Sequence, residues 1–377
     1  MHIVKINFAQ AKNFKSAEEL IHKWQLLDLP RAITKLGAQI TLVQFSDREL
    51  EFSKDNIRIF CVPAPSYIPR SLLHRVPILN ILLRVRGLSP DVIHIEGLHF
   101  PFHTYWMRTL FPYTPLCVQD HANKMPVNFF RSRFYQFVYK RVDGVLFTSR
   151  ELADIFFERG YFPKGLSIFE VLEGTTTFTP AEDQRSRNAL KQPRFVVVGD
   201  LIKTKDPLTV LSAFGAVLKK LPEATLDFYF RRDFMRSEVE ELLDAHPSLR
   251  KRVRLMGGIE HENLEEVFRN TDYFISGSTR EGGAYSLIEA LACGVTPVVT
   301  DIPVHRTILK NGLVGKLYPI GDHTELASKI IEAHSDVSPD IRCINRRHFE
   351  EHLAIDVTAQ RLLDIYTSVQ TIRTSGG

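Results

Sequence analysis

Runs of apolar residues alternate with amphipathic stretches along the chain, and this alternation predicts its architecture. Short runs rich in Val, Ile and Phe, each followed by a polar or glycine-containing turn, are typical of strands buried in a parallel sheet. The pattern predicts such strands at 3–8, 39–45, 56–62, 91–95, 115–119, 144–148, 167–172, 194–199, 225–230, 253–256, 272–276 and 296–300. Helical spacing separates them, so we expect an α/β fold built on doubly wound parallel sheets.

The helical stretches carry recognisable start and stop signals. Ser16 and Glu19 form a capping box that opens a helix reaching residue 36, and we expect Pro30 to break or kink this helix. Asp206 is expected to cap a helix whose first residue is a proline. Further helices are expected at 77–86, 127–142, 324–333, 339–349 and 354–371.

The chain is long enough for two domains. Its 377 residues exceed the size at which one hydrophobic core keeps growing. Residues 174–193 are polar and lack apolar periodicity, which makes this segment the expected linker. We therefore place an N-terminal Rossmann-like domain at 1–175 and a second one at 176–350.

Composition and charge narrow the function classes. With 44% hydrophobic and 24% charged residues the chain is globular, which excludes disorder as its main description. A net charge of +4 suits anionic ligands such as nucleotide diphosphates or a lipid surface, and it is too small and too evenly spread to indicate nucleic acid. The sequence contains neither a signal-peptide pattern nor an apolar run of about 18 residues. The four cysteines are scattered without a CxxC pair, so we expect reduced thiols and a cytoplasmic protein.

The segment 276–301 is the strongest candidate for chemistry. Glu281 lies in a loop with two glycines between two buried strands, and Glu289 lies eight residues later on the short helix that follows. Both carboxylates can then face one ligand at the carboxyl end of the sheet, where each suits a pair of sugar hydroxyls. Backbone N–H groups at Ser286 and Leu287 would open that helix, which favours a phosphate. The pattern therefore indicates a nucleotide-sugar site.

The same segment resembles the donor-site signature of the family 4 glycosyltransferases. The E-x7-E pattern stands here as EGGAYSLIE and continues as ALACG and PVV; one departure is Gly283-Ala284, where the family often has Phe-Gly. The resemblance implies a GT-B fold, in which two Rossmann-like domains face each other across a cleft. It implies that Glu289 holds the ribose and Glu281 the donor sugar hydroxyls. The loop and helix start that carry them would complete this part of the donor site, through Gly283, Tyr285, Ser286 and Leu287.

The segment 197–207 resembles the diphosphate clamp of the same family. Lys205 occupies the position of the clamp lysine, whereas Asp200 stands where the family usually has an arginine. Arg231 and Arg232 end the next strand, and we expect one of them to replace the missing cation while Asp200 forms an ion pair with it. Gly257 closes a further strand, resembling the place where the backbone approaches the nucleotide base; the plain alternatives are an ordinary turn and exposed basic residues.

The resemblance extends loosely over the first domain. His121 matches the histidine that contacts the donor sugar in the family, with a loop residue as the plain alternative. In the family the last helix crosses back to the first domain, so residues 351–377 are expected there. The implied reaction retains the anomeric configuration and needs neither metal nor cofactor beyond the nucleotide-sugar, and the β-phosphate accepts the acceptor's proton. We accordingly interpret His94, His99 and His103 as non-ligands.

Two alternative functions remain open. A nucleotide-sugar epimerase of the same fold would need a further carboxylate pair, and a catalytically silent sugar-binding subunit would fit the departure at Asp200. The sequence does not favour an NAD-dependent dehydrogenase, because no G-x-G-x-x-G follows a strand. The acceptor is expected to be a glycan, a lipid-linked sugar or a small molecule. The basic apolar helices 77–86 and 127–142 are interpreted as packed on the sheet, with contact with a membrane surface as the alternative.

Overall fold

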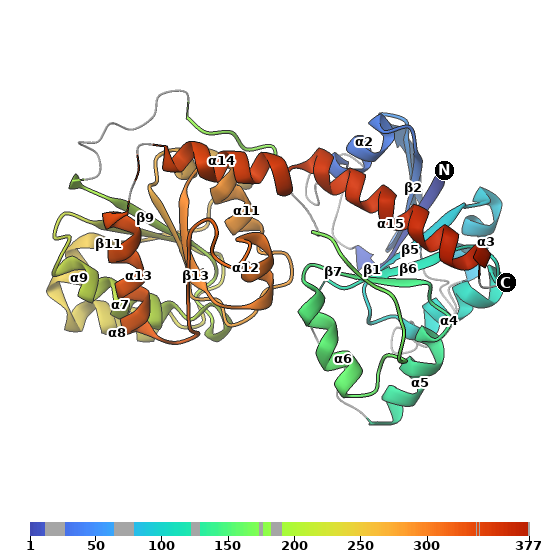
Figure 1. Cartoon of the computed structure of the whole chain (residues 1–377), viewed down its shortest axis with the longest axis horizontal. Helices are drawn as coiled ribbons and strands as arrows, with labels where there is room; N and C mark the ends of the chain where they lie inside the picture. Colours follow the sequence, from blue (N-terminus) through green and yellow to red (C-terminus); the bar gives the residue numbers. More distant parts are fainter. Residues whose placement is uncertain are drawn as a thin grey trace. The chain divides into compact units, whose positions relative to one another are not determined.

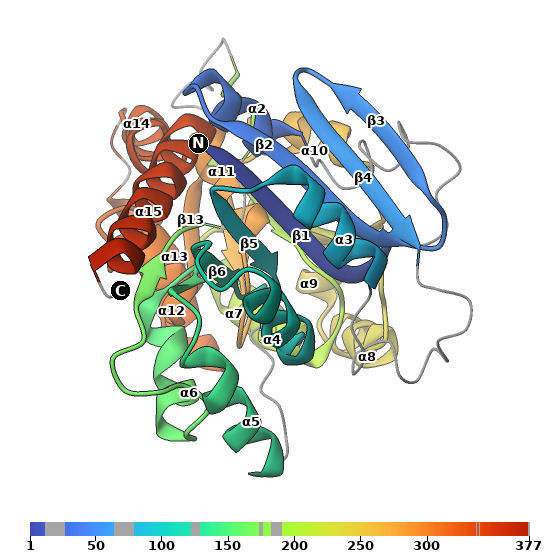
Figure 2. The same cartoon turned by 90° about the vertical axis from the view of Figure 1, so that its right-hand side faces the viewer.

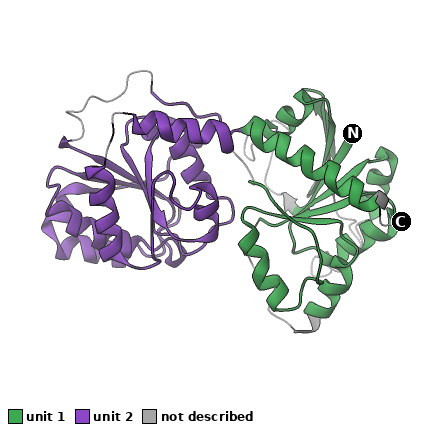
Figure 3. Cartoon of the chain, viewed as in Figure 1, with its two compact units in different colours: residues 1–174, 355–377 green, residues 175–354 purple. Residues whose placement is uncertain are grey.

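The computed structural model describes residues 1–11, 27–63, 79–121, 129–172, 176–181, 191–336, 338 and 340–375. The chain forms two compact units, residues 1–174 with 355–377 and residues 175–354 (Figure 3). Boundaries were expected at 175/176 and 350/351; the chain leaves unit 1 after Gly174 and returns to it at Ile355. Each unit contains its own parallel sheet with helices packed on it (Figure 1).

The described part of unit 1 contains an eight-stranded sheet in the order β3-β4-β2-β1-β5-β6-β7-β8. The strands are β1 (His2–Ala11), β2 (Gln39–Ser46), β3 (Leu50–Lys54), β4 (Ile57–Pro63), β5 (Val92–Glu96), β6 (Leu116–Gln119), β7 (Gly144–Phe147) and β8 (Ile168–Glu170). The helices are α2 (Asp28–Lys35), α3 (Leu79–Leu88), α4 (Pro101–Leu110), α5 (Phe129–Tyr139), the 3₁₀ turn η2 (Arg150–Ala153), α6 (Asp154–Glu158) and α15 (Ile355–Ser375). All seven strands that the sequence predicted in this unit are confirmed.

One edge strand of unit 1 was missed. β3 pairs antiparallel with β4, and the two form a hairpin at the sheet edge (Figure 2). The side chains of β3 are half-buried or exposed, so it lacks the apolar run that identified the other strands. The signal was in the turn: Asp55 and Asn56 both have positive φ, at 54° and 64°, the conformation that two-residue hairpin turns require.

Proline at position 30 does not interrupt a described helix. α2 begins at Asp28, so Pro30 lies in its first turn, where a missing N–H removes no intrahelical hydrogen bond. The expected capping box at Ser16 and Glu19 lies outside the described residues, as do 77–78 and 127–128 at the starts of two expected helices. None of the helices in the described ranges is long and apolar enough to cross a bilayer.

The last helix completes the core of unit 1. Buried residues of α15 pack with Ile3, Ile40 and Ile33 from the sheet and from α2, which lies beside α15 (Figures 1 and 2). Tyr366 of α15 is fully buried, and its hydroxyl lies 2.7 Å from Nδ1 of His94 on β5. α15 is therefore tied to the sheet by both packing and a buried hydrogen bond.

Unit 2 contains a six-stranded, wholly parallel sheet in the order β11-β10-β9-β12-β13-β14 in its described part. The strands are β9 (Arg194–Val198), β10 (Thr225–Tyr229), β11 (Val253–Gly257), β12 (Tyr273–Ser276), β13 (Thr296–Thr300) and β14 (Lys316–Tyr318). The helical elements are the 3₁₀ turn η4 (Lys203–Lys205), α7 (Pro207–Leu218), α8 (Arg236–Ala245), α9 (Pro247–Arg252), α10 (His261–Arg269), α11 (Tyr285–Ala292), α12 (Pro303–Ile308), α13 (His323–Ser335) and α14 (Ile341–His352). The five strands predicted here are confirmed; the three-residue β14 was missed.

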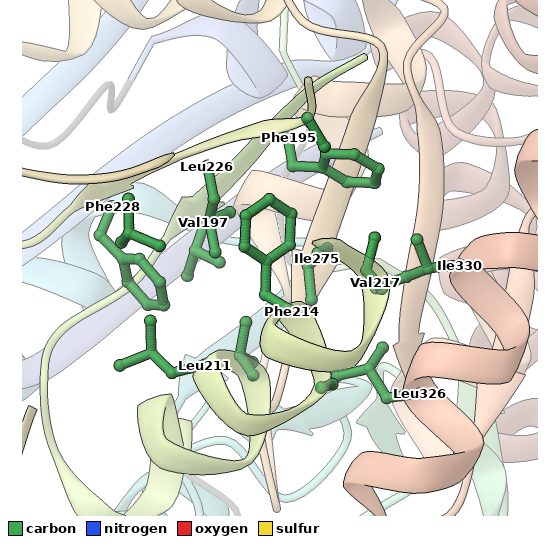
Figure 4. Packing of buried hydrophobic residues seen from close by; sticks show 14 of the residues in the cluster. Phe195, Val197, Leu211, Phe214, Val217, Leu226, Phe228, Ile275, Leu326 and Ile330 are labelled. Carbon is green, nitrogen blue, oxygen red and sulfur yellow. The ribbon is translucent and has the colours of Figure 1, made fainter. Parts of the chain in front are cut away.

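The core of unit 2 lies between the sheet and the helices α7, α8, α9 and α13. Figure 4 shows apolar side chains of the strands facing Leu211, Phe214 and Val217 of α7 and Leu326 and Ile330 of α13. α7 starts as predicted, because Asp206 accepts a hydrogen bond from the backbone N–H of Thr209 and Pro207 occupies the first helical position.

Helix α11, which follows β12 along the chain, packs against α14. Gly294 ends α11 with a φ of +77°, and a Cβ at this position would lie 2.8 Å from the carbonyl oxygen of Arg342 in the first turn of α14. Arg346 of α14 donates to the carbonyl of Ala292 at 2.7 Å. Glycine therefore lets α11 and α14 approach closely, which fixes the position of the helix that carries Glu289.

Candidate functional site

The candidate residues of unit 2 lie on loops at one edge of its sheet. Because the strands are parallel, the loops after β9, β10, β11 and β12 all leave from the carboxyl ends, the edge where open α/β sheets bind ligands. Lys205, Arg231 and Glu281 lie on the loops after β9, β10 and β12, and Gly257 is the last residue of β11. The topology thus gathers residues that are up to 76 positions apart in sequence, as are Lys205 and Glu281.

Glu281 and Lys205 form a direct ion pair. The Nζ atom of Lys205 donates to Oε1 of Glu281, and the same oxygen accepts a 2.5 Å hydrogen bond from Oγ of Ser278. Both partners are partly exposed, with 29% of the Lys205 side chain and 16% of the Glu281 side chain accessible. A cation and a carboxylate therefore stand together at the ligand-binding edge, within reach of solvent.

A glycine allows these two loops to meet. A Cβ on Gly277 would lie 2.8 Å from the carbonyl oxygen of Asp206 and 2.9 Å from that of Lys205, so no larger residue fits without moving the backbone. The N–H of Thr279 also donates to the carbonyl of Thr204 at 2.9 Å. The loop after β9 and the loop after β12 are thus joined through their backbones, and the Lys205–Glu281 pair depends on that junction.

The loop leading into α11 differs from the expectation. The left-handed residue is Ala284, with φ 46° and ψ 44°, and neither Gly282 nor Gly283 has a positive φ. Ala284 stands where the resembled family often has glycine, and it takes the backbone conformation that glycine tolerates and alanine disfavours by roughly 1–2 kcal/mol. The N–H of Leu287 donates to the carbonyl of Ala284 at 3.0 Å, within the first turn of the helix. Tyr285 and Ser286 form the first two residues of the helix, and the Tyr285 side chain is exposed.

Glu289 lies deeper than Glu281 and has a different partner. It projects from the second turn of α11, is only 5% exposed, and accepts a 2.6 Å hydrogen bond on Oε1 from Nε2 of His261. His261 is the first residue of α10, after β11. The hydrogen bond to Glu289 raises the pKa of His261, although burial opposes this shift. The carboxylate is thus held by an imidazole that its own charge helps to protonate.

The carboxylate of Asp200 is hydrogen-bonded by the two arginines that follow β10. Its Oδ1 accepts from the backbone N–H groups of Arg231 and Arg232, at 3.1 and 2.9 Å, and its Oδ2 accepts from Nε of Arg232 at 2.6 Å. Burial would raise the pKa of Asp200, but the hydrogen bonds from Arg232 and Arg231 outweigh burial and lower it. The ion pair expected between Asp200 and one of these arginines is confirmed for Arg232. The guanidinium of Arg231 instead donates to the carbonyl of Ile259 at 3.4 Å.

Gly257 has a backbone conformation that favours glycine. Its φ is +74°, at the point where the pairing of β11 with β10 shifts register, and a Cβ there would meet nothing within 4 Å. The backbone conformation, and not close approach within the chain, explains the glycine. The space beside it is open.

Unit 1 holds a separate polar cluster around His121. Nε2 of His121 pairs with Oε2 of Glu96 at the end of β5, and Oε1 of Glu96 pairs with Nζ of Lys5 on β1. Burial would raise the pKa of Glu96, but the charges of Lys5 and His121 bring it well below its usual value. His94 lies next to this cluster, with its Nε2 4.0 Å from Oε1 of Glu96. Burial lowers the pKa of His94 to about 3, so its ring is neutral. The neighbouring Asp120 is buried.

The structure adds residues that the sequence did not single out. His261, Ser278 and Glu96 each contact a predicted site residue, and Lys5 pairs with Glu96. Glu96 ends β5 and Ser278 follows β12 closely, which was the available signal, but His261 and Glu96 are distant in sequence from their partners. In the described ranges no group of three or more His, Cys, Asp or Glu side chains is arranged to hold a metal ion.

Two family models match the chain. Residues 179–348 match the glycosyl transferases group 1 model, and residues 23–166 match the glycosyl transferase 4-like domain model. The first match covers the described site of unit 2, and the second covers the strands that carry Glu96 and His121.

Curated relatives match over parts of the chain. The GtfA subunit of a UDP-N-acetylglucosamine–peptide N-acetylglucosaminyltransferase from Streptococcus agalactiae is 34% identical over 29% of this chain and 21% of its own length. A GDP-mannose:cellobiosyl-diphosphopolyprenol alpha-mannosyltransferase from Xanthomonas oryzae is 26% identical over 57% of each chain. The match spans only 21% to 37% of the length of the GtfA subunits and of a mycobacterial phosphatidyl-myo-inositol mannosyltransferase.

Solved structures share the fold over almost the whole length. Sucrose-phosphate synthase from Thermosynechococcus elongatus superposes with a TM-score of 0.71 at 17% identity, covering 99% of this chain and 100% of the other. HepE from Anabaena in complex with UDP gives 0.68 at 15% identity and covers 98% of this chain and 100% of the other. The chain thus has the GT-B fold, with two Rossmann-like domains, as predicted.

Relief of backbone strain at Ala284 is a first testable consequence. We expect Ala284→Gly to raise the free energy of unfolding by about 0.5–1 kcal/mol, because glycine adopts the left-handed conformation without steric conflict. The matched control is Ala245→Gly in the exposed last turn of α8, which should lower it by about 0.5–1 kcal/mol. Urea unfolding measures both; a loss of stability in the Ala284 variant would contradict the assignment of strain.

Proposed function

From the two family matches, which indicate a GT-B glycosyltransferase of the GT4 type, we propose that this chain transfers a sugar from a nucleoside diphosphate sugar to a hydroxyl acceptor. The main support is the ion pair between Lys205 and Glu281 at the carboxyl edge of the unit 2 sheet. Glu281 is the first acid of the E-x7-E segment. A donor of this kind presents a diphosphate and a sugar side by side. A cation next to a carboxylate matches that pair of groups.

The ion pair suggests how the donor enters. In the proposed complex Lys205 turns to the diphosphate, and Glu281 accepts hydrogen bonds from hydroxyls of the transferred sugar. Each partner exchanges one charge-assisted contact for another, so neither is left unpaired in a partly buried site. Glu289 receives the ribose hydroxyls. The remaining contacts come from the loop and helix start between the two acids and from the turn after β11, through Gly283, Tyr285, Ser286, Leu287 and Gly257.

The second cation of the clamp is proposed to be Arg231. Arg232 is already engaged by Asp200, whereas the Arg231 guanidinium is exposed and donates only a long hydrogen bond to a carbonyl among its described contacts. Asp200 is thus neutralised, and its backbone contacts fix the turn that presents Arg231. This arrangement answers the repulsion that a carboxylate near a diphosphate would otherwise cause.

The chemistry is proposed to retain the anomeric configuration. The donor's β-phosphate accepts the acceptor's proton as the glycosidic bond forms, with the nucleotide-sugar as co-substrate and no further cofactor or metal. His121 of unit 1, which pairs with Glu96, is proposed to contact the donor sugar. This assignment rests on the resemblance of the two segments to the family.

The acceptor is proposed to be a glycan or a lipid-linked sugar, in surface polysaccharide or glycoconjugate assembly. The relatives' names support this class: one concerns a diphosphopolyprenol-linked cellobiose and another phosphatidyl-myo-inositol. Their donors carry either uracil or guanine, as UDP-N-acetylglucosamine and GDP-mannose. Both bases therefore belong in any donor test.

Contact with a membrane surface is proposed as the way unit 1 would reach such an acceptor. On α3, Leu79 and Leu83 are 50% and 65% exposed, and Arg84 and Arg86 lie on the same helix. Arg84 stacks over Phe60 at 4.6 Å from the ring centroid, which orders that side of the helix. Exposed leucines on the same helix as basic residues suit an anionic lipid surface.

The central experiment is a donor panel followed by transfer assays. We expect one UDP-, GDP- or ADP-sugar to raise the melting temperature and to be consumed with retention of configuration by NMR, unaffected by EDTA. Inversion, or activity lost with EDTA and restored by manganese, would contradict the mechanism. Epimerised or hydrolysed donor without an acceptor would indicate the epimerase alternative, and binding without turnover would indicate the silent subunit.

The carboxylates give the first matched variants. Glu281→Ala and Glu289→Ala should each reduce kcat/KM by about ten- to a hundredfold or more, since each loses hydrogen bonds to a charged group worth about 1.5–3 kcal/mol. The control is Glu241→Ala on the exposed face of α8, which should match the wild type. Wild-type turnover in either site variant would remove that residue from the proposed site.

The clamp is tested by calorimetry with the accepted donor. We expect Lys205→Ala and Arg231→Ala each to weaken donor binding by about tenfold, whereas Arg232→Ala weakens it less, because Arg232 acts only by holding Asp200. The three variants differ by one basic side chain each. If the Arg232 variant loses more affinity than the Arg231 variant, the assignment of the second cation is wrong.

The membrane proposal is tested by co-sedimentation with vesicles. Vesicles containing phosphatidylglycerol should bind the wild-type protein, and the Leu79→Ser/Leu83→Ser double variant should bind several-fold less, since two exposed apolar side chains are removed. The control is Leu313→Ser, which removes an exposed leucine from unit 2 instead of unit 1. Equal binding of all three proteins would contradict a role for α3.

A further inference from the structure

Glu289 is the more buried of the two acids of the E-x7-E segment. It is 5% exposed, and Nε2 of His261 lies 2.6 Å from its Oε1. A carboxylate this buried remains ionised only when a hydrogen-bonding or charged partner compensates for lost water. In the described part of the chain the partner with this contact is His261, which the family signature does not include.

The His261 ring is held on the other side by Phe178. The two ring centroids are 5.1 Å apart with an interplanar angle of 32°, and Phe178 is buried. The carbonyl of Phe178 accepts a 2.8 Å hydrogen bond from Arg346 of α14, the helix that packs behind α11. The imidazole is therefore fixed between an aromatic ring and the carboxylate, and 38% of its side chain stays accessible.

The charges around the ring favour its protonated form. The hydrogen bond to Glu289 is the largest influence on the pKa of His261 and raises it; burial lowers it, the charges of Glu289 and Glu262 raise it, and that of Arg231 lowers it. A protonated imidazole neutralises Glu289 while occupying one lone pair of one oxygen. The other lone pairs of the carboxylate remain as acceptors for neutral hydroxyl donors.

We propose that His261 is a positioning residue for the ribose of the donor: it holds the Glu289 carboxylate ionised and oriented, so that Glu289 accepts the 2′- and 3′-hydroxyls of a ribonucleoside diphosphate. This inference rests on the proposed function, because it takes Glu289 as the ribose ligand. The inference adds His261, which lies outside the family signature, to the proposed donor site. It also predicts that the preference for a ribonucleotide over a deoxyribonucleotide depends on the His261 imidazole.

The test measures whether the contribution of His261 to nucleotide affinity depends on the ribose hydroxyls. Calorimetry compares UDP and GDP with their 2′,3′-dideoxy forms for the wild type, His261→Ala and His261→Gln. We expect His261→Ala to weaken the ribonucleotide by roughly tenfold and the dideoxy form by less than about twofold. His261→Gln, which keeps a donor near Glu289 but lacks the positive charge, should recover only part of the loss. His323→Ala, at the exposed start of α13, should match the wild type.

A merely structural role for His261 predicts another outcome. If the histidine only stabilises the start of α10, His261→Ala weakens both nucleotide forms equally, and this result overturns the proposal. An unchanged affinity for the ribonucleotide also overturns it while leaving the proposed function standing. If none of UDP, GDP and ADP binds the wild type, the proposed function itself fails and the inference falls with it.

The pH dependence gives a second readout. Wild-type affinity for the ribonucleotide should fall as the pH rises through the raised pKa of His261, because the neutral ring no longer compensates Glu289. His261→Gln should lack this step. A step of the same size in the Gln variant would assign the titration to another group and contradict the proposal.

Discussion

Every carboxylate at the candidate sites has to be compensated, because each is withdrawn from bulk water. Lys205 compensates Glu281, His261 compensates Glu289, Arg232 compensates Asp200, and Lys5 with His121 compensates Glu96. An unpaired charge in such surroundings would cost several kcal/mol, so these pairs determine which loops must lie together. In the proposed complex the donor opens only the Lys205–Glu281 pair, because it supplies an equivalent contact to each partner.

Backbone proximity makes this compensation feasible in unit 2. Gly277 lets the loop after β12 lie against the carbonyls of residues 205 and 206, and Gly294 lets α11 lie against α14. The first contact places the lysine beside Glu281, and the second fixes the helix that carries Glu289. Two glycines outside the E-x7-E pattern thus position both of its acids, and Ala284 between them accepts a conformation that alanine disfavours.

The parts that could be predicted from the sequence are those with a local signal. Buried strands followed by polar turns gave the sheets, and the order of strand and helix gave the fold. The pair of Asp200 with Arg232 could be expected because neighbouring parallel strands end at one edge. The partners of Glu289 and His121 were not predicted. Glu289 projects from helix α11, so the strand ends did not point to His261, and no signal distinguished Glu96 from the other polar residues at its sheet edge. Strand β3 and the left-handed Ala284 lacked any apolar or glycine signal.

The route of the chain has a consequence for its synthesis. Unit 2 is one continuous segment, whereas unit 1 takes its last helix from the end of the chain. Until α15 leaves the ribosome, the residues that pack against Leu362, Tyr366 and Val369 remain uncovered, and His94 lacks its tyrosine partner. Domains usually mature in the order of translation, but here the first unit to be made is the last to be finished. The nascent chain therefore carries an open apolar surface throughout the synthesis of unit 2, and α15 can cover that surface only afterwards.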